Sequence, residues 1–474
     1  MNISNYTWDV PVENKTSFEN FLSTSPNNPL QFSIFRPLCY FHFPRFNISK
    51  LPIEYIEKLI NMNHNVSTGN YNGSRFSVRN ENFGTIIYDK KYFRYYLINE
   101  SCKNILKSHY DYRDSHLLKG LSPLLRLADI PLKELAEVLY LCDKENFHYY
   151  SPFKIFFEIT TNCNMNCRHC LNKNSRRKSI NMTTEMIYQY LDWFQEQKIF
   201  EVNLTGGEPF LHPDISDILS YAIKIFPGLT ISTNGTILNN KILSVLRDIN
   251  LRYLNISLDG TEKTYKNVRH NYGFDEIINN IIFASQYVHD IGITITLNRY
   301  NIQEIEDIIK LAILNNIHKI NFGIVKYTNN NNNDDLLVES PRQLYENIKK
   351  IDTLCTSNNI LYYLPPDLPY NTIQNQNYNN LFFKQKFCLA GIFTLKILSD
   401  QTIIPCIFSP QKLTSDIKNV GITRAFQEIR EQVQKKANSN IKCDFFKKKC
   451  MGGCLSRYSL DTKCDKYCMK DIDK

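Results

Sequence analysis

Three cysteines stand close together in the first half of the chain, at a spacing that can bind metal. Cys163, Cys167 and Cys170 form a C-x3-C-x2-C run directly after the apolar segment 153–159. A four-iron cluster held by three thiolates keeps one iron without a protein ligand, and such an open position can bind a small molecule. A zinc site needs a fourth ligand, for which His169 is the nearby candidate, so zinc or a purely structural cluster is the lesser alternative.

The composition limits the compartment in which these thiols work. With 474 residues, 43% of them hydrophobic, the chain has the length of roughly three domains with real cores. The first residues lack a basic segment followed by an apolar stretch, and no run of about 18 apolar residues occurs. We therefore expect a cytoplasmic protein that does not enter a membrane. In a reducing compartment, the 14 cysteines favour metal or redox chemistry over disulfides.

The net charge is +9 and is spread along the chain. Ordinary surface charge accounts for most of it, and what remains suits an acidic peptide or an anionic cofactor. It is too diffuse to indicate nucleic acid.

Between residues 150 and 328, apolar segments alternate with amphipathic ones. The spacing predicts strands at 153–159, 201–205, 229–233, 253–259, 292–297 and 319–325. It predicts helices at 184–198, 214–226, 239–249, 274–289 and 302–315. Strict alternation means βαβ units and a parallel sheet, with the chemistry at the carboxyl ends of the strands. The expected fold class is therefore α/β, a partial (β/α)6 TIM-type barrel.

The flanking regions differ in pattern from the barrel. Short antiparallel strands and two amphipathic helices are expected at 74–145, which makes a small α+β domain, and residues 1–73 stay unassigned. Residues 329–387 are expected to bridge the barrel and the tail. The tail, 388–474, carries seven cysteines and is expected to be a separate Cys-rich domain.

Two motifs in the barrel region carry a resemblance to a known family. "CNMNCRHC" after one strand, followed by "LTGGEPFLHPD" at the end of the next, resembles the radical S-adenosylmethionine (SAM) enzymes. The family pattern is C-x3-C-x-aromatic-C, and His169 takes the aromatic position. The match covers 153–326. It implies that Cys163, Cys167 and Cys170 ligate a [4Fe–4S] cluster whose open iron chelates the amine and carboxylate of SAM.

Further residues resemble the cofactor contacts of this family. "GGEP" resembles the motif that receives the methionyl amino group, because glycines let the backbone approach closely and a glutamate accepts a charge-assisted hydrogen bond. "STNGT", "NISLDG" and "YKNVRHNYGF" follow in the family's order, with His270 in place of a usual glycine. A structural role is the alternative for Ser232, Ser257 and Arg269. The complete set is Gly206, Gly207, Glu208, Pro209, Ser232, Asn234, Ser257, Asp259 and Arg269.

The resemblance also implies the reaction. One electron from the reduced cluster, supplied by a donor such as flavodoxin or ferredoxin, cleaves the sulfonium carbon–sulfur bond of SAM. Methionine and a 5′-deoxyadenosyl radical result, and the radical abstracts a hydrogen atom from the substrate.

The tail resembles the SPASM extension, which carries two auxiliary [4Fe–4S] clusters. "CDFFKKKCMGGC" fits, whereas Gln401 stands where a glycine is usual. Seven thiolates cannot fully ligate two clusters, so we expect one cluster with an open iron that binds a substrate thiolate; a zinc ribbon is the alternative. The partition we expect is Cys443, Cys450, Cys464 and Cys468 for one cluster, and Cys388, Cys406 and Cys454 for the other.

The segment "FGTIIYDKKYFRYYLINESCKNILKS" resembles the small winged-helix domain that binds leader peptides by adding a strand to a three-stranded sheet; a structural cap is the alternative. Together the three parts indicate a maturase of ribosomally made (RiPP) precursor peptides that forms cross-links, with a thioether favoured. The alternatives are an anaerobic sulfatase-maturating type that oxidises Cys or Ser to formylglycine, a peptide epimerase, and a non-catalytic iron–sulfur or zinc protein that binds a peptide. No catalytic acid or base is evident.

Overall fold

The protein divides into two compact units, one built mainly from the residues before 151 and one from 151 onward. The computed structural model describes residues 32–35, 74–81, 84–91, 94–98, parts of 103–107 and 131–139, 151–171, 179–249, 251–269, 273–288, 290–325, 334–364, 390–391, 394–406 and 413–437. Within these residues no helix is long and apolar enough to cross a bilayer.

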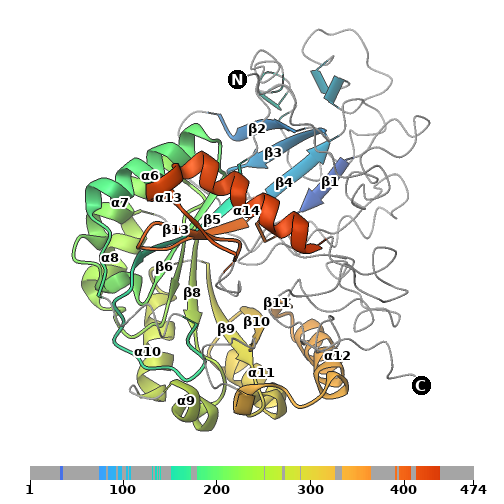
Figure 1. Cartoon of the computed structure of the whole chain (residues 1–474). Coiled ribbons are helices and arrows are strands. Elements are labelled where there is room, and N and C mark those ends of the chain that lie inside the picture. Colours follow the sequence, from blue (N-terminus) through green and yellow to red (C-terminus); the bar gives the residue numbers. More distant parts are fainter. Residues whose placement is uncertain are drawn as a thin grey trace. The chain divides into compact units, whose positions relative to one another are not determined.

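The first unit contains a four-stranded antiparallel sheet in the order β1-β4-β3-β2 (Figure 1). Its strands are β1 (Phe32–Phe35), β2 (Phe76–Glu81), β3 (Gly84–Asp89) and β4 (Arg94–Ile98). The short antiparallel strands expected within 74–145 are present as β2, β3 and β4. The edge strand β1 comes from the segment that had no assignment, because four residues are too few for a periodic pattern.

Arg75 connects the sheet of this unit to its helical part. Arg75 donates from Nε and Nη2 to the two carboxylate oxygens of Asp89, at 2.8 and 2.7 Å, and Tyr96 donates to the same carboxylate. The backbone N–H of Arg75 also donates to Glu134, which is helical. Buried charges need such complete pairing, so the ion pair joins the start of β2 to the end of β3, while the Glu134 contact joins the helical residues to the sheet.

The second unit is an α/β fold around one large sheet in the order β11-β10-β9-β8-β7-β6-β5-β12-β13-β14. The strands from β5 to β11 run parallel. The six expected strands are confirmed, as β5 (Lys154–Thr160), β6 (Glu201–Gly206), β7 (Thr230–Thr233), β8 (Tyr253–Ser257), β9 (Ile291–Leu297) and β10 (Lys319–Ile324).

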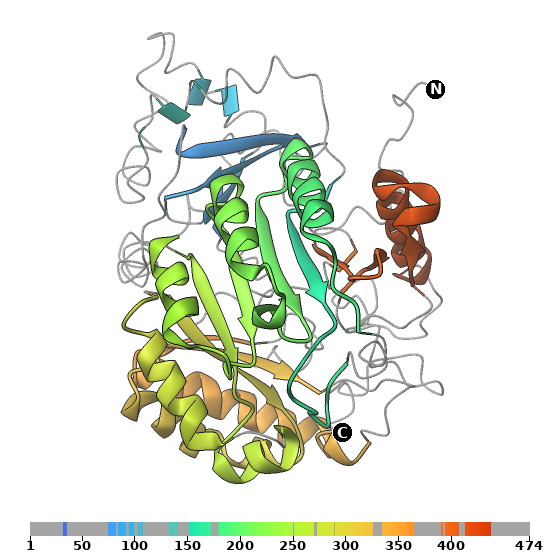
Figure 2. The same cartoon turned by 90° about the vertical axis from the view of Figure 1, so that its left-hand side faces the viewer.

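Helices cover the outer face of this sheet (Figures 1 and 2). The five expected ones are α6 (Thr184–Glu196), α7 (Ile215–Ile225), α8 (Asn240–Asp248), α10 (Phe274–Ala284) and α11 (Ile305–Leu314). In α6, the buried positions Ile187, Leu191 and Phe194 recur at helical spacing, and Thr183 caps the amino end by accepting from the N–H of Met186. The apolar stripe is therefore what holds the helix on the sheet.

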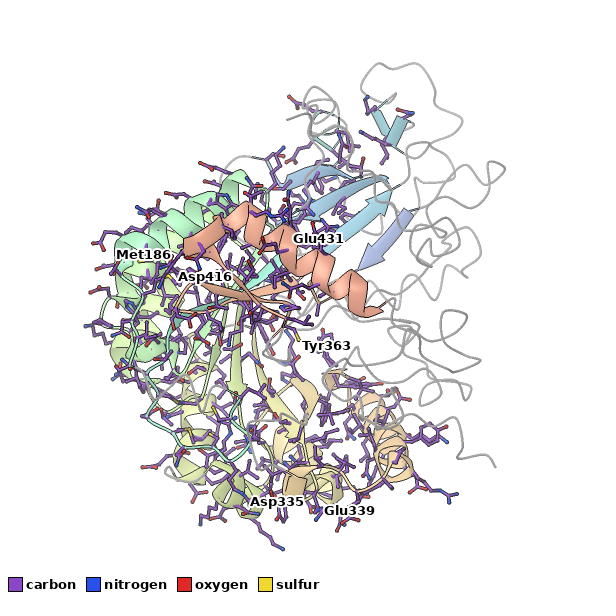
Figure 3. All side chains as sticks on the ribbon, viewed as in Figure 1. Met186, Asp335, Glu339, Tyr363, Asp416 and Glu431 are labelled. Atoms are coloured by element: carbon purple, nitrogen blue, oxygen red, sulfur yellow. The ribbon has the colours of Figure 1, made fainter. Side chains whose placement is uncertain are left out.

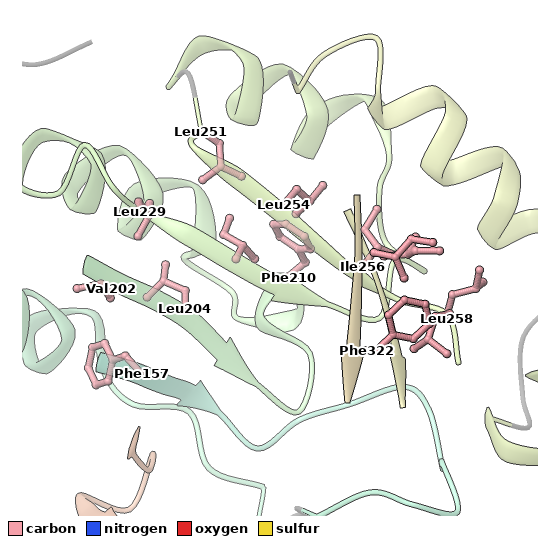
Figure 4. Packing of buried hydrophobic residues seen from close by; sticks show 14 of the residues in the cluster. Phe157, Val202, Leu204, Phe210, Leu229, Leu251, Leu254, Ile256, Leu258 and Phe322 are labelled. Carbon is pink, nitrogen blue, oxygen red and sulfur yellow. The ribbon is translucent and has the colours of Figure 1, made fainter. Parts of the chain in front are cut away.

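Strand residues alternate between an apolar outer face and a polar inner face. Ile155, Phe157 and Ile159 of β5 point outward into the main core. Figure 4 shows Phe157 in this layer with Val202 and Leu204 of β6. Lys154 and Glu158 therefore point inward, into the space that the sheet encloses.

The sheet extends beyond the expected barrel at both sides. On one side, α12 (Pro341–Ser357) and β11 (Leu361–Tyr363) add another helix–strand pair from within the region expected to be a bridge. On the other side, the tail supplies β12 (Thr394–Ile397), parallel to β5, followed by β13 (Thr402–Ile404), β14 (Ser415–Asp416), α13 (Ile417–Val420) and α14 (Ile422–Ala437). Buried Lys396 of β12 pairs with Glu158 of β5 at 2.7 Å.

Candidate active site

The loop after β5 carries the three cysteines at the carboxyl edge of the sheet. Cys167 is buried, whereas Cys163 and Cys170 are half-buried and pack against the core. The loop is held at both ends of the run: Thr161 donates to the carbonyl of Ile180, and Arg168 donates to the carbonyl of Val268, at 2.9 and 2.8 Å. All three thiols therefore project from one anchored segment.

The thiols fit an iron–sulfur cluster better than a single zinc ion. Within the part of the chain that the structure describes, no three His, Cys, Asp or Glu side chains converge as a mononuclear metal requires. A [4Fe–4S] cluster does not need several side chains on one metal ion, because each of three irons takes a single thiolate. His169, the fourth ligand that zinc would need, instead lies with Nε2 at 3.0 Å from Asp259. Burial raises the pKa of the Cys167 thiol to about 11 although nearby Arg269 lowers it, so this sulfur needs a cationic partner to ionise.

The two glycines at the end of β6 allow it to touch the cysteine loop. A Cβ on Gly206 would lie 2.4 Å from the carbonyl oxygen of Thr160, and a Cβ on Gly207 would lie 2.3 Å from that of Asn162. The N–H of Gly207 donates to Thr160 at 2.8 Å, and that of Glu208 donates to Asn162 at 2.7 Å. Close approach of two backbones is therefore the physical reason for glycine at both positions.

Glu208 is fully buried and joins β6 to the loop after β7. One carboxylate oxygen accepts from Thr233 Oγ1 at 2.8 Å, and the other accepts from the N–H of Asn234 at 2.7 Å. Burial raises the pKa of Glu208 to about 7 although these hydrogen bonds oppose the shift. Pro209 starts the short helical turn that follows, Pro209–Leu211. The contact of Glu208 with a methionyl amino group stays a prediction.

The "STNGT" segment brings an amide to the first cysteine. Asn234 Nδ2 lies 3.8 Å from Cys163 Sγ and 2.9 Å from Asn164 Oδ1. Ser232 is half-buried on the inner face of β7, where its hydroxyl donates to Asn203 at 3.1 Å. Both side chains were expected to contact the cofactor. Asn234 lies at the cysteine loop, whereas the hydroxyl of Ser232 is hydrogen-bonded to the neighbouring strand β6.

The end of β8 carries a buried ionic network. Arg269, the last residue of α9 (Glu262–Arg269), donates from Nε and Nη2 to Asp259 at 2.9 and 2.7 Å. Its Nη1 lies 3.9 Å from Cys167 Sγ. Burial alone would raise the pKa of Asp259, but Arg269 and then His169 hold it well below its usual range. Asp259 is therefore a permanent anion that orients two cationic or polar groups.

The expected ribose contacts at the end of β8 stay predictions. The second oxygen of Asp259 accepts from the N–H of Thr296 at 2.6 Å, so both carboxylate oxygens have protein partners. Ser257, the last residue of β8, is half-buried.

Two contacts of the cysteine loop were not expected from the sequence. His169 pairs with Asp259, and its place in a motif position that is usually aromatic is the one signal that marked it. Arg168 donates to Asn267 at 2.6 Å and also pairs with Asp335, which Figure 3 labels. Neither partner of Arg168 has a sequence signal, because both lie about a hundred residues or more away along the chain.

Of the tail cysteines, Cys406 is the one that the structure describes, shortly after β13, and it is half-buried. The expected ligands Cys388, Cys443, Cys450, Cys454, Cys464 and Cys468 lie outside the described residues.

Comparison with known proteins supports the reading of the barrel. Residues 157–312 match the model of the radical SAM superfamily. The mycofactocin maturase MftC of Mycobacterium ulcerans is 29% identical over 164 residues, which are 34% of this chain and 44% of that protein. The subtilosin biosynthesis protein AlbA of Bacillus subtilis is 27% identical over 159 residues, which are 33% of this chain and 36% of that protein. The chain thus spans less than half the length of these relatives.

A solved structure extends the likeness in fold. SuiB of Streptococcus suis, in its complex with a precursor peptide, SuiA, matches with a TM-score of 0.61 at 16% identity, covering 84% of this chain and 98% of that one. At this identity the match shows the fold. The assignment therefore rests on the family model, which identifies residues 157–312 of this chain as a radical SAM domain.

Proposed function

We propose that this enzyme modifies a ribosomally made precursor peptide by radical chemistry. The observation that carries the proposal is the anchored loop of three thiols, met from neighbouring strand ends by Glu208, Asn234 and the Asp259–Arg269 pair. One of its relatives is named a mycofactocin maturase and another a bacteriocin biosynthesis protein, and SuiB has been solved with a precursor peptide.

The described residues divide the work of holding the cofactors. Cys163, Cys167 and Cys170 would ligate three irons of a [4Fe–4S] cluster and leave the fourth for SAM. When bound and reduced, the cluster supplies the electron that splits SAM into methionine and a 5′-deoxyadenosyl radical. The glycine pair at the end of β6 lets the backbone of this strand approach the cysteine loop closely. Arg269, oriented by Asp259, holds a positive charge beside Cys167.

The first unit offers a means of binding the peptide. Among the residues that the structure describes there, the antiparallel sheet ends in two edge strands, β1 and β2. An extended leader peptide can add to such an edge through main-chain hydrogen bonds, which give affinity without demanding a particular sequence. We propose that this unit, through the domain expected at 74–145, recognises the leader segment of the precursor.

We further propose that the modification is a cross-link, with a thioether as the favoured product. The support is the seven-cysteine tail, which by its resemblance holds two auxiliary clusters, one with an open iron for a substrate thiolate. Formylglycine formation and epimerisation are the alternatives. Formylglycine formation is disfavoured, because the enzymes that perform it usually lack a front domain.

Anaerobic incubation of the reconstituted enzyme with SAM, a reductant and the candidate precursor tests the proposal. We expect 5′-deoxyadenosine to form only with reductant, and the peptide to lose two hydrogen atoms for each link. A matched peptide without its leader should react at least about tenfold more slowly at limiting concentration, which corresponds to ~1.4 kcal/mol of binding. Unchanged peptide mass with deuterium uptake from solvent would indicate epimerisation. No 5′-deoxyadenosine under any condition would overturn the proposal in favour of a peptide-binding protein.

A further inference from the structure

We infer that Asn234 and Arg269 set the reduction potential of the core cluster by donating N–H groups to two of its three thiolates. The two donors come from different elements and reach different sulfurs. Asn234 follows β7 and lies 3.8 Å from Cys163 Sγ. Arg269 ends α9 and lies 3.9 Å from Cys167 Sγ.

The orientation of the Asn234 amide follows from its other hydrogen bonds. Its oxygen, Oδ1, accepts two hydrogen bonds from Thr236, from the N–H at 2.9 Å and from the hydroxyl at 2.7 Å. Its nitrogen must therefore face the opposite way, toward Asn164 Oδ1 and Cys163 Sγ. An amide has two N–H groups on this nitrogen, one for each acceptor. The side chain is also 7% exposed, so water competes little for the donors.

The orientation of Arg269 is fixed in the same manner. Two nitrogens of its guanidinium bind Asp259 Oδ2 at 2.9 and 2.7 Å. Asp259 is in turn held by the N–H of Thr296, and it is fully buried. Because the guanidinium is a rigid fork, this pairing aims the remaining nitrogen, Nη1, at Cys167 Sγ. His169 Nε2 lies 3.0 Å from the same oxygen of Asp259 and so helps to hold this carboxylate.

Both contacts favour the reduced cluster. A [4Fe–4S] cluster that takes one electron from a donor becomes more negative, and hydrogen bonds to its sulfurs and nearby positive charge stabilise that extra charge. Asn234 acts through a neutral dipole, whereas Arg269 adds a positive charge that the ion pair with Asp259 partly offsets. Removing either donor should therefore make the cluster harder to reduce.

This inference rests on the proposed [4Fe–4S] cluster, and it does not depend on the identity of the peptide. It is tested by titrating the reconstituted enzyme with dithionite and following the electron paramagnetic resonance (EPR) signal of the reduced cluster. SAM is left out, so that any contact of Arg269 with the cofactor carboxylate cannot contribute. A variant with Cys163, Cys167 and Cys170 all changed to Ala gives the EPR signal of any iron outside the core cluster, which is subtracted.

Two variants alter the donors. Asn234→Asp has nearly the same shape, keeps the acceptor for Thr236, replaces the amide donor with an oxygen and adds a negative charge near Cys163. Arg269→Gln removes the charge. For each we expect the ratio of reduced to oxidised cluster at a fixed potential to fall by about tenfold, which is ~59 mV for one electron. In Arg269→Lys, which keeps the charge, the ratio of reduced to oxidised cluster should fall by less.

Matched changes elsewhere control for general effects. Asn239→Asp makes the same exchange at an exposed helix cap on the same loop, where Oδ1 accepts from the N–H of Ile242. Arg252→Gln removes a buried arginine at the amino end of β8, where it pairs with Glu201. Both controls should keep the wild-type potential. If the cluster potentials of Asn234→Asp and Arg269→Gln both equal that of the wild type, the inference is overturned and the proposed function still stands. Absence of any cluster signal from the wild type would instead count against both.

Discussion

Gln401 shows how a single residue can keep a backbone conformation that its type disfavours. It stands where the resemblance of the tail predicts glycine, and it adopts a left-handed backbone with φ of +72°. Its side chain accepts a hydrogen bond from the hydroxyl of Tyr190 on α6, at 3.2 Å. The sequence therefore revealed the departure, whereas the compensating contact between residues 211 positions apart was visible only in the structure.

Substitution of Gln401 separates these two effects. Gln401→Ala keeps the strained backbone and loses the hydrogen bond, whereas Gln401→Gly loses the bond and relieves a strain of roughly 1–2 kcal/mol. We expect the glycine variant to be more stable than the alanine variant by about 1 kcal/mol. Thermal unfolding under anaerobic conditions measures the difference. Equal stability of the two variants would show that the left-handed backbone costs nothing here.

Glu208 gives a pH-dependent contribution to the stability of the apo protein. Burial raises its pKa from 4.5 to about 7 in the folded state, so the folded protein binds this proton more tightly than the unfolded chain does. The contribution of Glu208 to stability is therefore fully present below pH 4.5 and is lost as the pH rises through about 7.

The variant Glu208→Gln tests this pH dependence. Wild type should gain stability relative to Glu208→Gln as the pH falls from 8 toward 5, by about 3 kcal/mol at most. Urea unfolding of both proteins after removal of iron measures this gain. A constant difference between them across this range would contradict a raised pKa.

At the scale of elements, the six expected strands and five expected helices are confirmed. A buried parallel strand has a continuous apolar sequence, and a surface helix has apolar residues at helical spacing, so both can be recognised in the sequence. Shorter or more polar elements were not predicted from the sequence. The strand β11 has three residues, and α9 is a polar eight-residue helix whose role is to deliver Arg269. The contacts that shape the site, such as Asn234 with Cys163, join loops that follow different strands, and no local pattern encodes them.

The fit between β6 and the cysteine loop can be tested through its glycines. Gly207→Ala places a Cβ against the backbone of Asn162, which cannot move without displacing the cysteine loop. We expect this variant to fold but to lose the iron of one cluster after reconstitution. The control is Gly273→Ala, whose added Cβ would meet the flexible end of the Glu276 side chain. Iron and sulfide analysis measures the outcome, and full iron content in Gly207→Ala would show that the close approach is not required.

At the scale of the whole molecule, the chain combines a radical SAM barrel with parts before and after it. The tail is joined to the barrel by the pairing of β12 with β5 and by the buried Lys396–Glu158 pair, which also covers what would otherwise be an exposed strand edge. Changes in cysteine density and periodicity along the sequence predicted a separate tail module. The sequence did not indicate that the tail continues the barrel sheet, because β12 is four residues long.

The proposed radical chemistry requires that one iron of the core cluster is left open for SAM. EPR of the dithionite-reduced enzyme with and without SAM tests this requirement, after subtraction of the spectrum of the variant that lacks Cys163, Cys167 and Cys170. We expect the g values of the core cluster to shift when SAM is added, because its amine and carboxylate bind the open iron. A core-cluster spectrum that stays the same at saturating SAM would contradict the account.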